Sequence, residues 1–133
     1  MKTKPLVLIV DDDDNFLEIL SLQLQVSGSK TSILKSSDEK EVVARCEKLK
    51  PDLVLLDIFE FQKPVGFQIA QALKRNKSTK DIKIAFWSAA GRHWTDVVSD
   101  QTIEMKSFIK RIPFFDKGED VAVMTQKIIK LLA

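Results

Sequence analysis

The chain has 133 residues, of which 44% are hydrophobic and 30% charged, and its formal net charge is +2 at pH 7. This length corresponds to one domain with room for a buried core. A charge so close to zero, carried by scattered lysines, argues against direct binding of nucleic acid. The apolar runs are too short to cross a bilayer and no segment resembles a signal peptide, so we expect a cytoplasmic protein without a membrane partner.

Short apolar runs alternate with amphipathic stretches along the chain, which is typical of a parallel β-sheet with helices on both faces. The predicted strands are residues 6–10, 31–34, 53–56, 82–87 and 107–112. The predicted helices are residues 14–26, 38–49, 65–76, 92–104 and 118–132.

Apolar side chains at helical spacing indicate which helix faces are buried. The second predicted helix carries Cys46, the single cysteine, at an apolar position, which favours a packed thiol and excludes an internal disulfide. The first predicted helix is expected to face the core with Phe16, Ile19, Leu20, Leu22 and Leu24.

Two of the predicted strands end in aspartates: Asp11 to Asp14 follow the first, and Asp57 closes the third. The carboxyl ends of parallel strands meet at one edge of a sheet, so these carboxylates are expected to cluster. Repulsion between them is relieved by a shared proton or a hard cation, and Mg²⁺ suits such a donor set. An acidic helix N-terminus is the alternative, and it accounts for Asp13 and Asp14 but not for Asp57.

Three stretches carry a resemblance to the receiver domain of two-component response regulators: residues 7–13, 50–58 and 84–90. The resemblance spans nearly the whole chain and implies a single domain, residues 1–133. It implies a flavodoxin-like (CheY-like) α/β fold, doubly wound around five parallel strands in the order 2-1-3-4-5. Carried over by position, it implies that Asp57 accepts a phosphoryl group. The implied Mg²⁺ ligands are Asp11, Asp12, Asp57 and the backbone carbonyl of Phe59.

The resemblance also implies roles after strands four and five. Ser88 corresponds to the hydroxyl residue that contacts the phosphoryl group, and Phe108 to an aromatic switch residue. The family places a lysine directly before a proline after strand five, whereas here Ile112 precedes Pro113. Lys110 and Arg111 are therefore the two candidates for the lysine role. Spacing from Ser88 favours Lys110, and alignment on Phe108 favours Arg111.

The resulting hypothesis is a stand-alone phosphoacceptor rather than an enzyme, with self-catalysed phosphotransfer and dephosphorylation left open. Its implied partners are a sensor histidine kinase or phosphotransfer protein and a downstream protein, and homodimerisation is left open. A second hypothesis is a phosphorylation-independent pseudo-receiver that acts as an interaction module, because the lysine–proline pattern is disturbed. A third is a haloacid-dehalogenase-type phosphatase, which would carry phosphate on Asp11 instead of Asp57.

Overall fold

The computed structural model describes residues 4–11, 14–36, 38–58, 65–88 and 101–133, with residues 14–16 described by their backbone alone. Within these residues, the strands form one parallel sheet in the order β2-β1-β3-β4-β5. The strands are β1 (Leu6–Val10), β2 (Lys30–Leu34), β3 (Leu53–Asp57), β4 (Lys83–Ser88) and β5 (Phe114–Asp116). The predicted fold class and strand order are confirmed.

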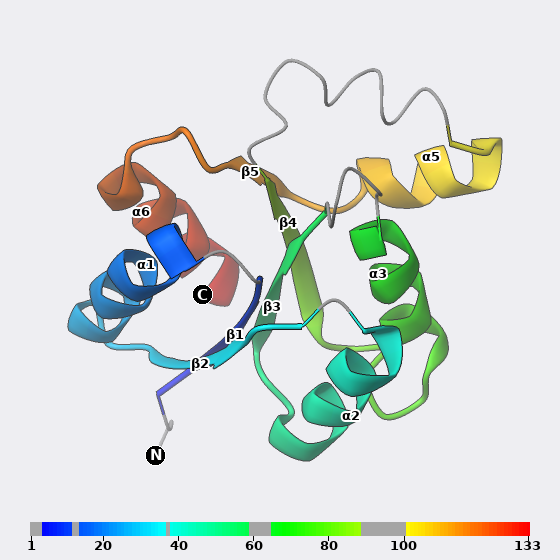
Figure 1. Ribbon diagram of the computed structural model, residues 1–133, viewed down its shortest axis with the longest axis horizontal. Coiled ribbons are helices and arrows are strands. Elements are labelled where there is room, and N and C mark those ends of the chain that lie inside the picture. The colour runs from blue at the N-terminus through cyan, green and yellow to red at the C-terminus, as the bar shows by residue number, and fades with distance from the viewer. Residues whose placement is uncertain (1–3, 12–13, 37, 59–64, 89–100) are drawn as a thin grey trace.

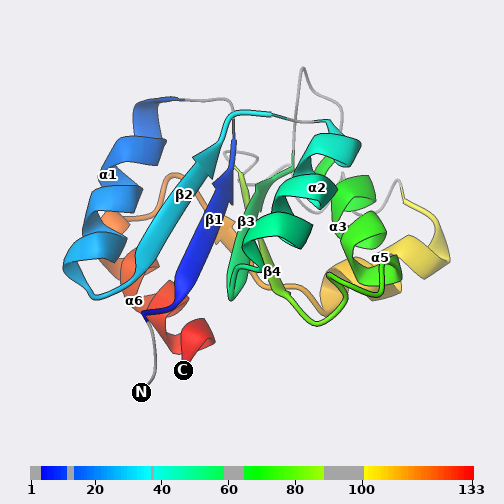
Figure 2. The same cartoon turned by 90° about the horizontal axis from the view of Figure 1, so that it is seen from below.

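Helices cover both faces of this sheet (Figure 1, Figure 2). One face lies under α1 (Asp14–Val26) and α6 (Val121–Leu132). The other lies under α2 (Glu39–Leu49), α3 (Val65–Arg75) and α5 (Ile103–Lys110). Over the described ranges, no helix combines the length and the apolar character needed to cross a membrane.

Each face of the sheet buries its own core, because successive side chains of a strand point to opposite faces. Ile9, Leu55 and Trp87 belong to the core under α1 and α6, whereas Leu56 and Phe86 belong to the other core. Each core includes a residue near the carboxyl end of a strand, Val10 in one core and Trp87 in the other, so packing reaches the carboxyl edge of the sheet.

The helix faces agree only in part with the predicted pattern. Cys46 is fully buried in α2, as expected for a packed thiol. On α1, Leu20 and Leu24 are buried as predicted, but Ile19 and Leu22 are 52% and 60% exposed. Their predicted burial is wrong because the buried stripe begins at Leu17, which is 1% exposed. The buried stripe continues at Leu20 and Leu24, three and seven residues after Leu17, and this spacing turns Ile19 and Leu22 towards solvent.

The predicted strand over residues 107–112 is wrong, since Ile103–Lys110 form helix α5 and the last strand begins only at Phe114. The Thr102 side chain caps this helix by accepting a hydrogen bond from the Met105 N–H at 3.2 Å. The apolar residues that pack on the core recur at helical spacing: Met105, Phe108, Ile109 and Ile112. The predicted helix over residues 92–104 lies largely outside the described residues.

This correction moves Lys110 and Arg111 away from the carboxyl edge of the sheet. Lys110 ends α5 and is exposed. Arg111 lines a hollow of about 490 Å³ together with Leu53 and Lys83, which begin β3 and β4. That hollow lies at the amino ends of these strands, so the predicted place of Lys110 and Arg111 beside Asp57 is wrong.

Candidate functional site

Four side chains converge at the carboxyl edge of the sheet, and each comes from a different strand. Asp11 follows β1, Asp57 ends β3, Trp87 lies near the end of β4 and Lys117 follows β5. Each lies two residues beyond a side chain of the core under α1 and α6, namely Ile9, Leu55, Ala85 and Phe115. The period of two along a strand therefore brings all four residues to the same face of the sheet.

Lys117 joins the two carboxylates of this group. Its Nζ lies 2.5 Å from Oδ2 of Asp11 and 3.6 Å from Oδ2 of Asp57. The side chain of Lys117 is 6% exposed, that of Asp11 is 0% and that of Asp57 is 15%. Burial strengthens the attraction of opposite charges, so this ammonium offsets the repulsion that two neighbouring carboxylates would otherwise have.

The sequence interpretation missed Lys117 because it placed the last strand too early. A usable signal was present. Phe114 precedes Lys117 by three residues, the same spacing as between Phe108 and Arg111, which the resemblance had paired as aromatic and basic positions. Phe114 opens β5, whereas Phe108 lies partly buried on α5 against the core. Gly118 follows Lys117, at the place where the family has proline.

Ser88 reaches the same edge from the end of β4 and is buried. Its backbone carbonyl accepts a hydrogen bond from the Lys117 N–H at 2.9 Å, which ties the start of the Lys117 segment to β4. Because Asp57 and Trp87 are paired across β3 and β4, Ser88 lies one residue beyond the level of Asp57.

The described donors suit Mg²⁺. Asp11 and Asp57 offer hard carboxylate oxygens, and this ion commonly takes one or two carboxylates and fills its octahedron with water. Over the described ranges, no group of three or more histidine, cysteine, aspartate or glutamate residues could hold a metal. Asp12 and the carbonyl of Phe59, the other two predicted ligands, lie outside the described residues. The pair is thus compatible with Mg²⁺ in its donor chemistry.

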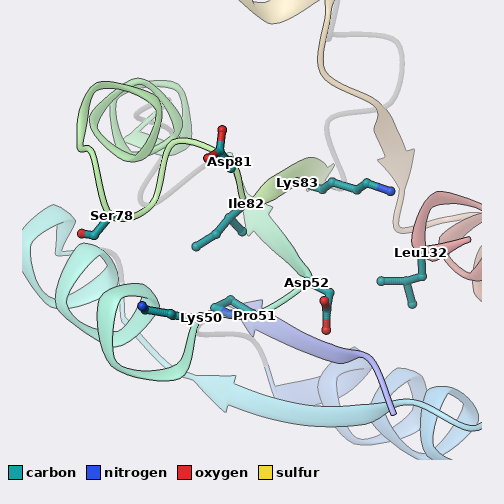
Figure 3. Close-up of a pocket in the computed structure, with 8 residues that line it drawn as sticks. All are labelled: Lys50, Pro51, Asp52, Ser78, Asp81, Ile82, Lys83 and Leu132. Atoms are coloured by element: carbon teal, nitrogen blue, oxygen red, sulfur yellow. The ribbon is translucent and has the colours of Figure 1, made fainter. Parts of the chain in front are cut away.

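A separate hollow of about 330 Å³ lies at the opposite, amino edge of the sheet (Figure 3). Asp52 lines it, and its Oδ2 accepts a hydrogen bond from the Leu6 N–H at 2.7 Å. Lys83 lines it as well, and its Nζ donates to the Leu131 carbonyl at 2.6 Å. Both side chains therefore have structural roles. Asp52 links the start of β3 to the start of β1, and Lys83 links the start of β4 to α6.

The fold and the site define a class of protein. In an open parallel sheet, ligands bind at the carboxyl edge where the strand order reverses. In the order β2-β1-β3-β4-β5 this point lies between β1 and β3, and Asp11 and Asp57 flank it. The molecule is therefore a doubly wound α/β protein with an acidic site and a buried lysine at its switch point.

Comparison with known proteins gives the family. The sequence model of the response regulator receiver domain matches residues 7–113, and the chain belongs to this family. The match ends just before β5, so it covers both aspartates but not Lys117.

Similarity to curated proteins supports this family assignment. The chain is 32% identical over 88 residues to the DNA-binding dual master transcriptional regulator RpaA of Synechocystis, covering 66% of this chain and 35% of RpaA. It is 33% identical over 85 residues to the phosphate regulon transcriptional regulatory protein PhoB of Pseudomonas aeruginosa, covering 64% and 36%. The matched part spans about a third of the length of these relatives.

Solved structures share the fold. A response regulator from Thermotoga maritima superposes with a TM-score of 0.74 at 19% identity, over 97% of this chain and 98% of that one. The chemotaxis response regulator CheY4 of Vibrio cholerae superposes with a TM-score of 0.75 at 17% identity, over 97% and 99%.

Proposed function

We propose that this receiver domain is a phosphoacceptor: Asp57 takes a phosphoryl group from a sensor histidine kinase or a histidine phosphotransfer protein. The observation that carries the proposal is the unequal exposure of two carboxylates that contact the same ammonium. The Asp57 side chain is 15% exposed, and that of Asp11 is 0% exposed and 2.5 Å from Lys117. A phosphodonor can therefore approach Asp57, whereas Asp11 is covered.

The proposed step is a transfer between phosphohistidine and aspartate. A carboxylate oxygen of Asp57 bonds to phosphorus as the phosphorus–nitrogen bond breaks, and the imidazole nitrogen keeps the electron pair and takes up a proton. Phosphoryl transfer asks a protein mainly for positioning and for compensation of charge on the oxygens. Lys117, 3.6 Å from Oδ2 of Asp57, is placed to stabilise that charge. Ser88, buried at the same edge, is the proposed hydroxyl contact.

Mg²⁺ is the cofactor of this proposal, and when bound it neutralises charge on the phosphoryl oxygens. Asp11 and Asp57 would hold it, together with Asp12 and the carbonyl of Phe59. Asp11 then has two roles, because it binds the ion and also holds the ammonium of Lys117 in place.

The proposed output is a changed surface for a downstream protein partner in the cytoplasm. Phosphorylation adds charge that can bias a nearby two-state element. Lys117 follows β5 and its backbone N–H is bonded to Ser88, so movement at the site is passed to β5 and α6. Phe114, which pairs with Phe86 across β4 and β5, is the aromatic on that path.

RpaA and PhoB are transcriptional regulators by name, and regulation of transcription is one process that such an output would serve.

A phosphorylation-independent interaction module is the second candidate. Gly118 follows Lys117 where the family has proline, and this departure favours the second candidate. Glycine restricts the backbone beside Lys117 less than proline would, so the lysine is held less firmly for a phosphorylation switch. The altered lysine–proline pattern in the sequence also favours this candidate, but the contacts of Lys117 with both carboxylates count against it.

The test is the intact mass of the chain after incubation with acetyl phosphate and Mg²⁺, with peptide mapping of the modified residue. The native chain and Asp81→Asn, a variant at an exposed aspartate, should each gain one phosphoryl group on Asp57. Asp57→Asn should gain none, and removal of Mg²⁺ should abolish the gain. Phosphate mapped to Asp11 would identify phosphatase-type chemistry instead. A native chain that stays folded and unmodified would point to the interaction module.

A further inference from the structure

The indole of Trp87 also contacts the buried ammonium of Lys117, in addition to the two carboxylates. Nζ of Lys117 lies 4.6 Å from the centroid of the Trp87 ring, and the same atom contacts the carboxylates of Asp11 and Asp57. Trp87 is 1% exposed and is paired with Asp57 across β3 and β4.

We infer that Trp87 is a positioning residue for Lys117, which holds the ammonium at the acidic pair through a cation–π contact. In its effect on phosphorylation, this inference rests on the proposed function. A lysine side chain has a flexible four-carbon stem, so its charge needs fixed neighbours to stay in one place. A cation over an aromatic face is attracted more strongly when it is desolvated, and tryptophan is the best aromatic partner. Lys117, at 6% exposure, meets this condition.

The indole N–H argues that packing alone does not explain this residue. Nε1 of Trp87 is buried and has no hydrogen-bond partner among the described residues. A buried donor without a partner costs free energy, and a phenyl ring would fill much of the same space without that cost. What the indole adds over a phenyl ring is a larger and more electron-rich face for the cation.

Substitutions of Trp87 separate its packing role from its cation–π contact with Lys117. Trp87→Phe keeps an aromatic face and Trp87→Leu removes it, so the rate of Asp57 phosphorylation by acetyl phosphate should fall in the order Trp, Phe, Leu. The expected loss for Trp87→Leu is roughly thirtyfold, which is the rate equivalent of a desolvated cation–π contact. Trp87→Phe should lose rate without an equal loss of stability in urea, because it also removes the buried N–H. Equal rates for the Phe and Leu variants would overturn the inference.

A double-mutant cycle tests whether Trp87 acts through Lys117. Trp87→Leu should slow phosphorylation in the native background and have little further effect in the Lys117→Met background. The same loss in both backgrounds would mean that the indole acts through packing, and would overturn the inference.

Fluorescence provides a test that needs no phosphorylation. In a Trp94→Phe background Trp87 is the sole tryptophan, and Lys117→Met should change its emission intensity, while Lys127→Met at an exposed lysine of α6 should not. An unchanged emission in Lys117→Met would overturn the contact itself. If the native chain never gains a phosphoryl group but the emission responds as expected, the phosphoacceptor proposal fails while the positioning of Lys117 stands.

Discussion

Gly66 lies so close to the backbone of Asp57 that no side chain fits between them. A Cβ atom at Gly66 would lie 2.6 Å from the carbonyl oxygen of Asp57 and 2.7 Å from Cα of Ile58. The Gly66 N–H also donates to the Ile58 carbonyl at 2.9 Å. Because the obstructing atoms are backbone, they cannot rotate aside, and α3 is held directly against the end of the strand that carries Asp57.

We therefore predict that Gly66→Ala destabilises the protein and displaces Asp57. Overpacking against a fixed backbone costs about 1–3 kcal/mol, more than the gain in helix propensity from alanine. Urea unfolding measures the stability, and the rate of phosphorylation by acetyl phosphate reports the position of Asp57. Gln68→Ala, at an exposed position of the same helix, is the control and should change neither. A Gly66→Ala variant as stable as the native chain would contradict the close contact.

The lysine assignment gives a second prediction. Lys117→Met leaves the Asp11 and Asp57 carboxylates without their shared ammonium, and loss of one partner of a buried ion pair costs about 3–5 kcal/mol. We expect a large loss of stability in urea without divalent metal, partly recovered with Mg²⁺, which supplies the missing positive charge. Lys110→Met removes the same kind of charge from an exposed position on α5, and its stability should stay within about 0.5 kcal/mol of native. Equal effects of the two variants would refute the role of Lys117.

The contrast between these two lysines shows how far the sequence could lead. The long apolar runs of β1, β3 and β4 predicted buried strands within a residue or two, and the aspartates at the ends of β1 and β3 predicted the acidic edge. The last strand has only three residues, Phe114–Asp116, which is too short to show a period. The segment before it contains the apolar residues Phe108, Ile109 and Ile112, and such a composition also suits a strand. Its spacing from Met105 to Ile112 is nevertheless helical.

The partners of Trp87 could not be predicted for a related reason. An apolar strand with a tryptophan at its end indicates burial, and Trp87 is indeed buried. Its contact with Lys117 depends on the register of β3, β4 and β5 and on which residue follows the last strand. Register is a property of the assembled sheet, so this contact becomes visible only when the place of β5 is known.

Cys46 gives a prediction about pH. Burial in α2 raises the pKa of this thiol to about 11 from 9.0. Above pH 9 the unfolded chain loses the proton while the folded chain keeps it, so stability should fall from about pH 9 to about pH 11. The expected loss is on the order of 2 kcal/mol. Urea unfolding across this range measures it, and Cys46→Ala should be less stable at pH 7 but lack this part of the decline. Rapid modification of the native thiol at pH 8 by a thiol reagent would contradict its burial.

Magnesium gives the last prediction, and it links the acidic pair to stability. An ion that binds only the folded chain stabilises it by RT ln(1 + [L]/Kd), which is about 1.4 kcal/mol at ten times Kd. We expect Mg²⁺ to raise the midpoint of thermal unfolding of the native chain, because Asp11 and Asp57 come together only in the folded sheet. Asp57→Asn and Asp11→Asn should each lose most of this rise, and Asp81→Asn should keep it. Sodium chloride at matched ionic strength separates binding from screening. If the rise persists in both site variants, the ion binds elsewhere, and Lys117 is then the group that offsets the repulsion within the acidic pair.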